Sequence, residues 1–362
     1  MRSWQALIGG GVAVIGAVAG GFAFHRSTSL DDHVDAASAT RAALRQNPEA
    51  AELIRYATLA ANSHNSQPWL FQADAGGIRI LPDYRRRTPV VDPDDHHLFA
   101  SLGGAAENLA IAAASRGRPG SVTFNPDKLT LDFRFGKEST AFASLVDAIP
   151  RRQSTRADYD GRAVANSALD ALSKAALEPE VDTVLITDRA QLARVKDLVI
   201  AGNSAQIGDP AFVRELRAWM RFSPRQAMKN RDGLFSATTG NPVVPEWIGT
   251  AMFDLFLNAE TENDNYRSAI DSSAGIAIFV SQRDDVAHWV KAGRASQRFA
   301  LQATALGLKC AYLNQPVEVG SLRGELASLA GLPGRRPDIV MRFGYGPERP
   351  YSLRRSVSDL LS

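Results

Sequence analysis

The sequence predicts an α+β fold in which two related halves of one chain form a pseudo-dimer around a shared helical core. Three observations support this prediction: one helical segment occurs twice, strand-like segments occur in both halves, and further helical segments surround them. A single long repeat indicates a duplicated domain rather than a solenoid, because solenoids stack at least three short repeats.

The repeated segment is an apolar helix. Residues 103–117, GGAAENLAIAAASRG, match residues 293–307, GRASQRFALQATALG, and this alignment pairs Gly103 with Gly293. An apolar run that ends in glycine predicts a buried helix with a defined end. Because small residues cover nearly every face, we expect the two copies to pack closely against each other.

Short apolar segments predict strands in both halves. In the first half these are residues 77–83 and 128–136, and in the second they are residues 182–188, 274–282 and 338–346. Helices are expected at residues 49–61, 167–177, 190–201 and 210–221. The combination predicts two sheets that share a helical core.

The N-terminal segment indicates location rather than catalysis. Residues 6–24 carry no charge and are long enough to cross a bilayer as a helix. Alternatively they are the apolar region of an export signal, with Ala17-Val18-Ala19 as the cleavage site. Six glycines disfavour a buried helix of the fold. We therefore predict that residues 1–29 are a membrane anchor or signal, and that the protein is anchored in the inner membrane or exported to the periplasm or cell envelope.

The composition excludes several classes of partner and site. The chain has 362 residues, of which 45% are hydrophobic, and 41 basic against 39 acidic residues give a net charge of +2. Because no basic run occurs, nucleic acid is not an expected partner. Cys310 is the only cysteine, which excludes an internal disulfide, and the histidines lack metal-ligand spacing. Adjacent His96 and His97 are therefore expected to be a solvated pair, and no metal is predicted.

An arginine motif lies near the boundary between the two halves. Arg152, Ser154 and Arg156 occupy alternate positions ahead of a predicted helix. On an extended segment alternate side chains face one way, so these groups would converge. Forked guanidinium donors and a hydroxyl suit a phosphate group. The alternative is a solvated basic loop between the halves.

A polar loop, NSHNSQPW at residues 62–69, follows the first predicted helix of the first half. Its amide and hydroxyl groups both donate and accept hydrogen bonds, as the edge of a flat heterocycle requires. The alternative is an ordinary helix-capping loop, because Asn and Ser are favoured there. A cap needs only one or two such residues, whereas this loop has five.

Together these motifs resemble those of the nitroreductase family of flavin enzymes, and within it the Acg-like group, in which two related halves lie in one chain. The resemblance rests on SHNSQPW, on RQSTR at residues 152–156, on the glycine-bounded helix in both halves, and on the ending DIVMRFGYGPERPYSLRRSV. It implies a nitroreductase-like fold with halves at residues 30–148 and 149–362. The family's usual homodimer would thus be fused in this chain, which would be a monomer or would dimerise further.

The resemblance implies an FMN site built from both halves. Arg152, Ser154 and Arg156 would hold the phosphate and the pyrimidine side of the flavin, while Arg354 and Arg355 would complete the phosphate site. Further candidates for the wall around the flavin ring are Ser63, Asn65, Gln67, Pro68, Asn314, Gln315 and Pro316. Each motif occurs once, and the nearest counterpart of the arginine motif in the first half is SATRAALRQNPEA at residues 38–50. We therefore expect one FMN per chain.

The implied activity is oxidoreduction. NADH or NADPH would reduce FMN, and a small acceptor such as a quinone or nitroaromatic would then take the electrons in a ping-pong cycle, because this chemistry belongs to the flavin. Arg156 near the pyrimidine edge would stabilise the anionic reduced ring, and no side chain is assigned as catalytic. The aromatic segment 209–259 is either a set of core helices or a lid. If a lid bars the nicotinamide, the protein would store FMN or sense redox state instead.

Overall fold

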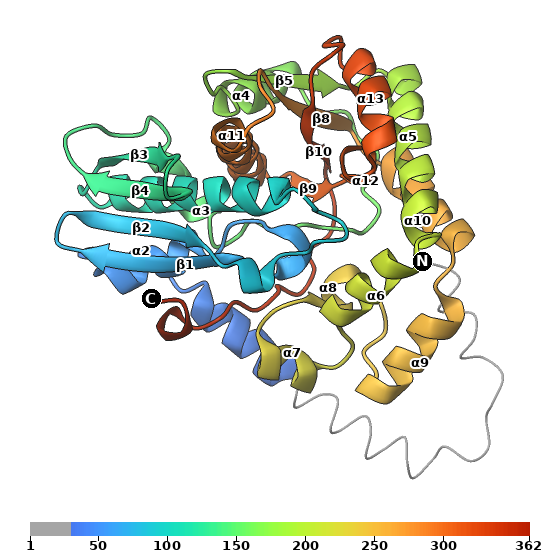
Figure 1. Ribbon diagram of the computed structural model, residues 1–362, viewed down its shortest axis with the longest axis horizontal. Helices are drawn as coiled ribbons and strands as arrows, with labels where there is room; N and C mark the ends of the chain where they lie inside the picture. The colour runs from blue at the N-terminus through green and yellow to red at the C-terminus, as the bar shows by residue number, and fades with distance from the viewer. Residues whose placement is uncertain (1–29) are drawn as a thin grey trace.

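The computed structural model describes residues 30–362. The predicted anchor or signal at residues 1–29 lies outside the described residues and stays a prediction. The described chain folds into two four-stranded sheets with two long helices between them (Figure 1).

The first sheet has the strand order β1-β2-β4-β3, and all neighbours are antiparallel. Its strands are β1 Trp69–Asp74, β2 Gly77–Pro82, β3 Gly120–Asn125 and β4 Thr130–Phe135. In β4, Leu131 and Phe133 are buried, whereas Asp132 on the other face binds Arg79 of β2 at 2.7 Å. This alternation is typical of a sheet with one face on the core.

The second sheet has the order β5-β8-β10-β9 and is also antiparallel. Its strands are β5 Val181–Ile186, β8 Gly275–Ser281, β9 Lys309–Tyr312 and β10 Pro337–Gly344. Every residue of β8 and β10 is buried, because helices cover both faces. Ile276 and Ile278 pack toward α5 (Arg189–Ile207) and α10 (Ala259–Asp271), while Phe279 packs on Phe299 of α11 (Val286–Ala305).

The two sheets have the same topology. Strands β1, β2, β3 and β4 occupy the places that β5, β8, β9 and β10 occupy in the second sheet. Helices α2 (Ala50–Ala57) and α4 (Asn166–Ala175) precede β1 and β5 respectively. The α+β class and the pseudo-dimer of two related halves are therefore confirmed. The predicted strands all form, and β1, β3 and β9 are additional to the prediction.

The core helices α3 (His96–Ser115) and α11 pack against each other at their glycines. A Cβ on Gly103 would lie 2.1 Å from the carbonyl oxygen of Val290, and a Cβ on Gly293 would lie 1.9 Å from that of Ala100. The repeat that pairs 103 with 293 also pairs 100 with 290. The contact is therefore reciprocal, as in the isologous interface of a two-fold dimer.

Polar side chains repeat this reciprocity. Glu107 of α3 lies 2.9 Å from Arg298 of α11, and Gln297 donates a 2.8 Å hydrogen bond to Asn108. The repeat aligns residue 107 with residue 297 and residue 108 with residue 298. The Glu107–Arg298 and Gln297–Asn108 contacts therefore occupy equivalent positions on the two sides of the interface. Arg294 also binds Glu107 at 2.8 Å. Burial alone would raise the pKa of Glu107, but the two arginines hold it below its usual value.

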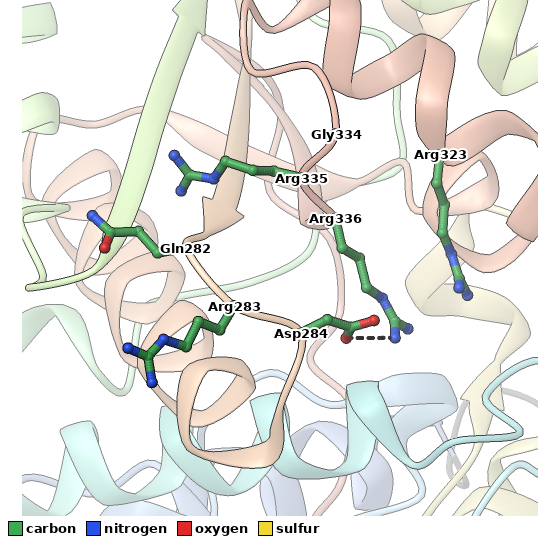
Figure 2. A pocket seen from close by; sticks show the side chains of 7 residues that line it. All are labelled: Gln282, Arg283, Asp284, Arg323, Gly334, Arg335 and Arg336. Atoms are coloured by element: carbon green, nitrogen blue, oxygen red, sulfur yellow. Dashed lines mark hydrogen bonds and ion pairs between the residues drawn. The ribbon is translucent and has the colours of Figure 1, made fainter.

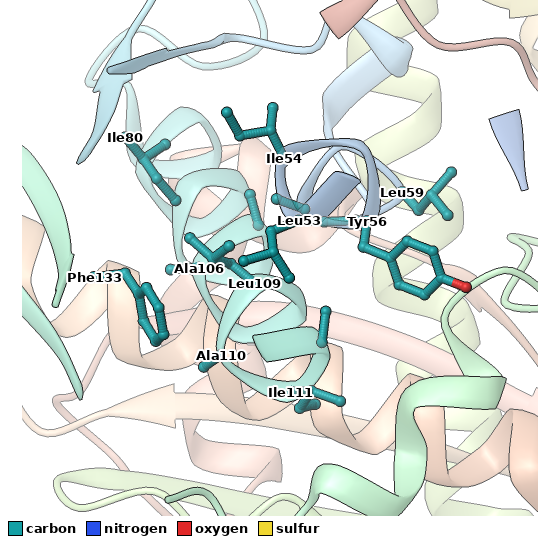
Figure 3. Packing of buried hydrophobic residues seen from close by; sticks show 14 of the residues in the cluster. Leu53, Ile54, Tyr56, Leu59, Ile80, Ala106, Leu109, Ala110, Ile111 and Phe133 are labelled. Carbon is teal, nitrogen blue, oxygen red and sulfur yellow. The ribbon is translucent and has the colours of Figure 1, made fainter. Parts of the chain in front are cut away.

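Figure 3 shows how the first half packs on α3. Leu53 and Tyr56 of α2 contact the helix from one side, and Phe133 of β4 lies on the other, with Ala106 and Leu109 between them. Within residues 30–362, α3 is the one helix that is long and apolar enough to cross a membrane, but 89% of its apolar window is buried inside the fold.

Residues 209–259, here named the arm, interrupt the second half between β5 and β8. The arm contains α6 Pro210–Trp219, β6 Met220–Arg221, α7 Pro224–Asn230, β7 Leu234–Phe235, α8 Ser236–Thr239 and α9 Glu246–Phe256. Figure 1 shows these short elements extending from α5 and α10 along the first half. The arm is thus separate from both main sheets.

A helix covers residues 30–40 at the start of the described chain, and the remaining elements are short. They are η2 Ser63–Asn65, η3 Tyr84–Arg86, η4 Ala143–Ala148, α12 Gln315–Glu318, η5 Gly320–Leu322, α13 Arg323–Leu329 and η6 Val357–Asp359. After β10 the C-terminal tail, residues 345–362, crosses to the first sheet. There Phe71 of β1 donates to the carbonyl of Leu360 at 2.8 Å and accepts from Ser362 at 3.1 Å. The tail therefore ties the second half to the first.

Candidate functional site

The backbone of the polar loop is strained. His64, Asn65 and Gln67 have φ values of 49°, 54° and 55°, in the left-handed region that non-glycine residues seldom adopt. Residues in this region usually persist only when surrounding contacts fix them, and they concentrate at functional sites.

Gln67 is one of the residues that fix this backbone. Its amide group donates to the carbonyl of Arg231 in the arm at 2.8 Å and accepts from the backbone of Arg355 in the tail at 2.8 Å. Its own backbone N–H donates to the side chain of Asn62 at 2.8 Å. Gln67 is fully buried. It therefore joins the loop, the arm and the tail, and Pro68 beside it is buried as well.

Asn65 connects the same three segments. Its Nδ2 donates to the carbonyls of Gly233 and Leu353, each at 3.2 Å, and its Oδ1 accepts from Arg354 at 2.7 Å. Both ends of the amide are thus occupied by the protein. The structure brings Asn65 to the predicted phosphate arginine Arg354, but as a support for the loop.

Three arginines converge beside this loop, and we name Arg41, Arg152 and Arg354 the arginine cluster. Arg152 and Arg354 are buried, and Arg41 is partly buried. Burial, followed by repulsion from Arg152, lowers the pKa of Arg41 to about 9. The pKa of Arg354 falls well below its usual value because of burial and repulsion from the other two.

Carbonyl groups at the C-terminal end of α2 hold two members of the arginine cluster in place, and Arg41 donates to the carbonyl of Ser352 at 3.2 Å. Arg354 donates to the carbonyls of Thr58 at 2.6 Å and Ala60 at 3.3 Å, and Arg152 donates to that of Leu59 at 3.2 Å. A helix C-terminus favours cations because its last carbonyls are unpaired. Within the described chain no carboxylate pairs with the cluster, and the Nε atoms of Arg41 and Arg152 are buried without a hydrogen-bond partner. The cluster is thus suited to an anion.

Arg41 was not predicted as a site residue. It lies in the 38–50 segment, which is the nearest counterpart of the arginine motif in the first half. Arg41 precedes Ala50, the first residue of α2, by nine positions, and Arg156 precedes Asn166, the first residue of α4, by ten. Comparison of these two spacings could have identified Arg41.

Arg355 does not join the arginine cluster, although it was expected to complete the phosphate site. Its side chain lies 3.7 Å from the carboxylate of Asp83 and donates to the carbonyl of Asp359 at 2.9 Å. Neighbouring side chains on an extended chain point to opposite sides. Arg354 therefore points to the end of α2, whereas Arg355 points to Asp83 and Asp359.

At the other end of the arginine motif, Arg156 is exposed and lies near a second group of polar residues. We name His64, His97, Arg156 and Glu318 the polar cluster. Four residues of extended chain span about 13 Å, so the backbone positions of Arg152 and Arg156 lie roughly that far apart. The two arginines therefore belong to different clusters. Between them, the backbone of Ser154 forms an isolated parallel β-bridge with Cys310 of β9.

His64 stays neutral at physiological pH. Burial lowers its pKa to about 4; Glu318 opposes this shift, while Arg156 and His97 add to it. The Nδ1 atom of His64 lies 3.1 Å from the hydroxyl of Ser63, a predicted site residue. His64 itself was not predicted, although its place between Ser63 and Asn65 gave a signal.

His97 and Glu318 form an ion pair in the polar cluster, with 3.4 Å between Nε2 and Oε1. Gln206 donates to the other carboxylate oxygen at 2.6 Å. Burial would lower the pKa of His97, but Glu318 raises it above its ordinary value; His97 in turn keeps the pKa of Glu318 low despite burial. The expected solvated histidine pair is wrong. Both rings are buried because α3 is a core helix, and His96 lies 3.0 Å from Asp338.

The predicted residues 314–316 surround the start of α12. Asn314 accepts from the backbone of Val340 at 2.9 Å, so its side chain anchors this turn. Gln315 is buried and hydrogen-bonds Tyr266, and Pro316 is buried. The helix also carries Glu318, which the sequence interpretation missed. The structure thus brings Gln315 and Glu318 near Arg156.

A separate cleft of about 260 Å³ lies between the β8–α11 and α13–β10 loops, and Figure 2 shows its lining. Arg336 binds Asp284 at 2.9 Å there, and Arg335 binds Asp182 at 2.5 Å. None of the predicted site residues lines this cleft. It is therefore distinct from the candidate site.

The chain is similar to proteins of Mycobacterium tuberculosis over most of its length. It is 25% identical to "Putative NAD(P)H nitroreductase Rv3131" of strain H37Rv, across 85% of this chain and 90% of that protein. It is 21% identical to "Putative NAD(P)H nitroreductase acg", across 85% and 93%. No family model matches. These relatives confirm the resemblance to Acg-type, nitroreductase-like proteins.

Solved structures with some similarity include a nitroreductase with bound FMN from Bacteroides fragilis, at 14% identity and a TM-score of 0.36, covering 56% of this chain and 88% of that one. The FMN-dependent nitroreductase NfnB from Mycobacterium smegmatis in complex with NADPH gives 12% identity, a TM-score of 0.37 and the same coverage.

Proposed function

We propose that the chain is an FMN-dependent oxidoreductase that receives a hydride from NADH or NADPH and passes the electrons to a small acceptor of the quinone or nitroaromatic type. The observation that supports this most directly is the arginine cluster. Three guanidinium groups lie close together with depressed pKa values, two of them on carbonyls at the C-terminal end of α2 and Arg41 on the carbonyl of Ser352, and none has a carboxylate partner among residues 30–362. Such an arrangement is unfavourable unless an anion binds to it, and the phosphate of FMN fits this requirement.

Different residues of the site would bind different parts of the cofactor. Arg41, Arg152 and Arg354 would hold the phosphate, and Arg156 would face the pyrimidine side of the ring. FMN, when bound, supplies the hydride and electron transfer. One cofactor per chain is expected, because the arginine cluster takes one residue from the first half, one from the arginine motif and one from the tail.

The polar cluster would adjust the electrostatics beside the ring. His64 is neutral and Glu318 is paired with His97, so among the described residues no carboxylate forms an ion pair with Arg156, although burial raises the pKa of the nearby Glu262 and Arg156 lowers it. Such a cation stabilises a nearby negative charge. Arg156 would therefore favour the reduced, anionic form of the cofactor.

The arm determines how reactants reach this site. It is bound to the polar loop through Asn65 and Gln67, and Asp232 pairs with both Arg86 of the first half and Arg221 of the arm. Ping-pong turnover requires nicotinamide and acceptor to use the same space in succession. We expect this space to open on the side of the polar cluster, away from residues 231–233.

The first test is the visible spectrum of the purified full chain after incubation with FMN. We expect flavin bands that bleach when NADPH or NADH is added without oxygen. Absence of bound flavin would overturn the proposal. Bound flavin that only dithionite reduces would instead indicate storage of FMN or redox sensing without turnover.

Two variants connect this test to the arginine cluster. Arg152→Gln and Arg354→Gln should each weaken FMN binding by about tenfold to a hundredfold, because each removes a charge-assisted hydrogen bond to phosphate. Arg162→Gln is the matched control, since Arg162 pairs with Asp160 at the surface. Equal FMN affinity in all three variants would show that the arginine cluster does not bind FMN.

A further inference from the structure

Helix α9 of the arm carries apolar side chains on its outer face. Trp247 and Leu255 are 73% and 75% exposed, the largest values among the big hydrophobic residues of the described chain. Ala251, midway between them, is also exposed. Residues four positions apart lie on one side of a helix, so these three form a continuous stripe. We name Trp247, Ala251 and Leu255 the α9 stripe.

The opposite side of α9 is packed. Phe253 packs edge-on against Phe222 with ring centroids 6.3 Å apart, and a Cβ on Gly249 would lie 2.3 Å from the same ring. The helix orientation is therefore fixed, because Gly249 and Phe253 must face Phe222. Exposure of the α9 stripe follows from this packing.

The beginning of the described chain lies close to the same part of the arm. The ring of His33 is 4.5 Å from that of Phe235 in β7, and β7 pairs with β6 through Phe235 and Arg221. Phe222, which supports α9, follows Arg221 directly. A short series of contacts thus links residue 33 to α9.

The sequence before residue 30 indicates what surrounds this region. Residues 6–24 form an uncharged apolar run, and only residues 25–29 separate it from the described chain. Five residues span at most about 18 Å when fully extended. If residues 6–24 lie in a membrane, residue 30 and the adjoining arm must lie close to its surface.

We propose that the α9 stripe contacts the headgroup region of that membrane, so that the arm is a second point of attachment beside residues 6–24. Tryptophan is enriched at membrane interfaces, and an amphipathic helix on the surface adds to the effect of another anchor. The charges favour a zwitterionic surface. Glu246 and Trp247 lie beside each other at a shallow hollow of about 650 Å³, where a cationic choline or ethanolamine group is accommodated by the Glu246 carboxylate and the indole. Asp254, on the same hollow, pairs with Arg217 at 3.0 Å.

The test uses the intact chain with one fluorophore. Leu255→Cys is labelled with an environment-sensitive dye, and the protein is reconstituted into phosphatidylcholine and phosphatidylethanolamine vesicles that contain nitroxide-labelled lipid. Cys310 stays unlabelled, because it is buried and its pKa is raised to about 12. Leu177→Cys is the matched control, since Leu177 is 71% exposed outside the arm.

Quenching by nitroxide lipid should be several times stronger at position 255 than at position 177, and Trp247→Glu should reduce it. Equal quenching at the two positions, or failure of the intact chain to associate with vesicles, would overturn the proposal. Energy transfer between labelled chains that disappears on dilution with unlabelled chain would also overturn it, because the α9 stripe would then bind a second copy.

Discussion

At the scale of single residues, the site depends on charges whose protonation is set by their neighbours. Glu318 raises the pKa of His97 above its ordinary value despite burial, and His97 holds the pKa of Glu318 below its ordinary value. His64, a short distance along the same cluster, is neutral because burial dominates. Three titratable side chains in one cluster therefore respond to different ranges of pH.

The His97–Glu318 pair should make folding stability depend on pH in a defined direction. A histidine with a raised pKa stabilises the fold fully below its unfolded pKa of about 6.5, and this contribution is lost as pH rises through the folded pKa. Glu318 has a lowered pKa, so its contribution is present above about pH 4.5 and lost as pH falls through its folded pKa. Urea denaturation should give a larger free energy of unfolding at about pH 6 than at about pH 9.

Variants assign this pH dependence to the pair. His97→Gln should remove most of the difference between the two pH values. His64→Gln is the control and should retain it, because a histidine with a pKa of about 4 does not titrate in this range. An unchanged pH dependence in His97→Gln would contradict the assignment.

The arginine cluster should also respond to simple anions. Ligands that bind only the folded state stabilise it in proportion to RT ln(1 + [L]/Kd), so inorganic phosphate at about ten times its Kd adds about 1.4 kcal/mol. We expect phosphate to raise the melting temperature of the flavin-free chain, and Arg41→Gln to reduce this effect. Arg162→Gln should behave like the unmodified chain, and loss of the effect there would point to nonspecific screening.

At the scale of elements, the close contact of α3 and α11 depends on two glycines that face backbone carbonyls. Gly103→Ala and Gly293→Ala should each destabilise the fold by about 3 kcal/mol or more, because backbone cannot move aside as a side chain would. Gly104→Ala is the matched control. Its Cβ would lie 3.6 Å from the Cβ of Ala60, an ordinary contact, so helix propensity predicts a gain of up to about 1 kcal/mol.

Thermal denaturation of the three glycine variants distinguishes these outcomes. If Gly104→Ala destabilises the chain as much as Gly103→Ala, the cost is not caused by the helix contact.

The elements that the sequence predicts well are those with a strong periodic pattern. The repeat identified α3 and α11, and apolar runs identified β8 and β10, because each of these elements is buried on most sides. β1 was missed because it follows the polar loop directly and loses its alternation after Phe71. The residues of the candidate site were harder to place. Arg355 resembles Arg354 in sequence, and only the direction of the tail separates them, while Glu318 and His97 meet through contacts between distant segments.

At the scale of the whole molecule, the two halves should unfold together. They share the buried contacts of Glu107 with Arg294 and Arg298, and the tail crosses from one sheet to the other. Glu107→Ala should cost about 3–5 kcal/mol, because it leaves buried arginines without their carboxylate. Glu180→Ala removes a surface pair with Lys291 and should change stability little.

Denaturant unfolding of these variants, followed by Trp fluorescence and by circular dichroism, checks both statements. We expect a single transition with both probes. Two separate transitions would show that the halves are independent folding units.

The reciprocal contact between α3 and α11 has a consequence for how such a chain changes over evolutionary time. In an assembly of two identical polypeptides, every substitution at the axis is made twice, so both symmetric positions must carry the same pair. Here one position holds Glu107 with Arg298 and the other holds Asn108 with Gln297. One copy is ionic and the other neutral. Covalent fusion has therefore allowed a single interface to hold two different chemistries, and a charged pair is dehydrated once where an exact dimer would dehydrate it twice.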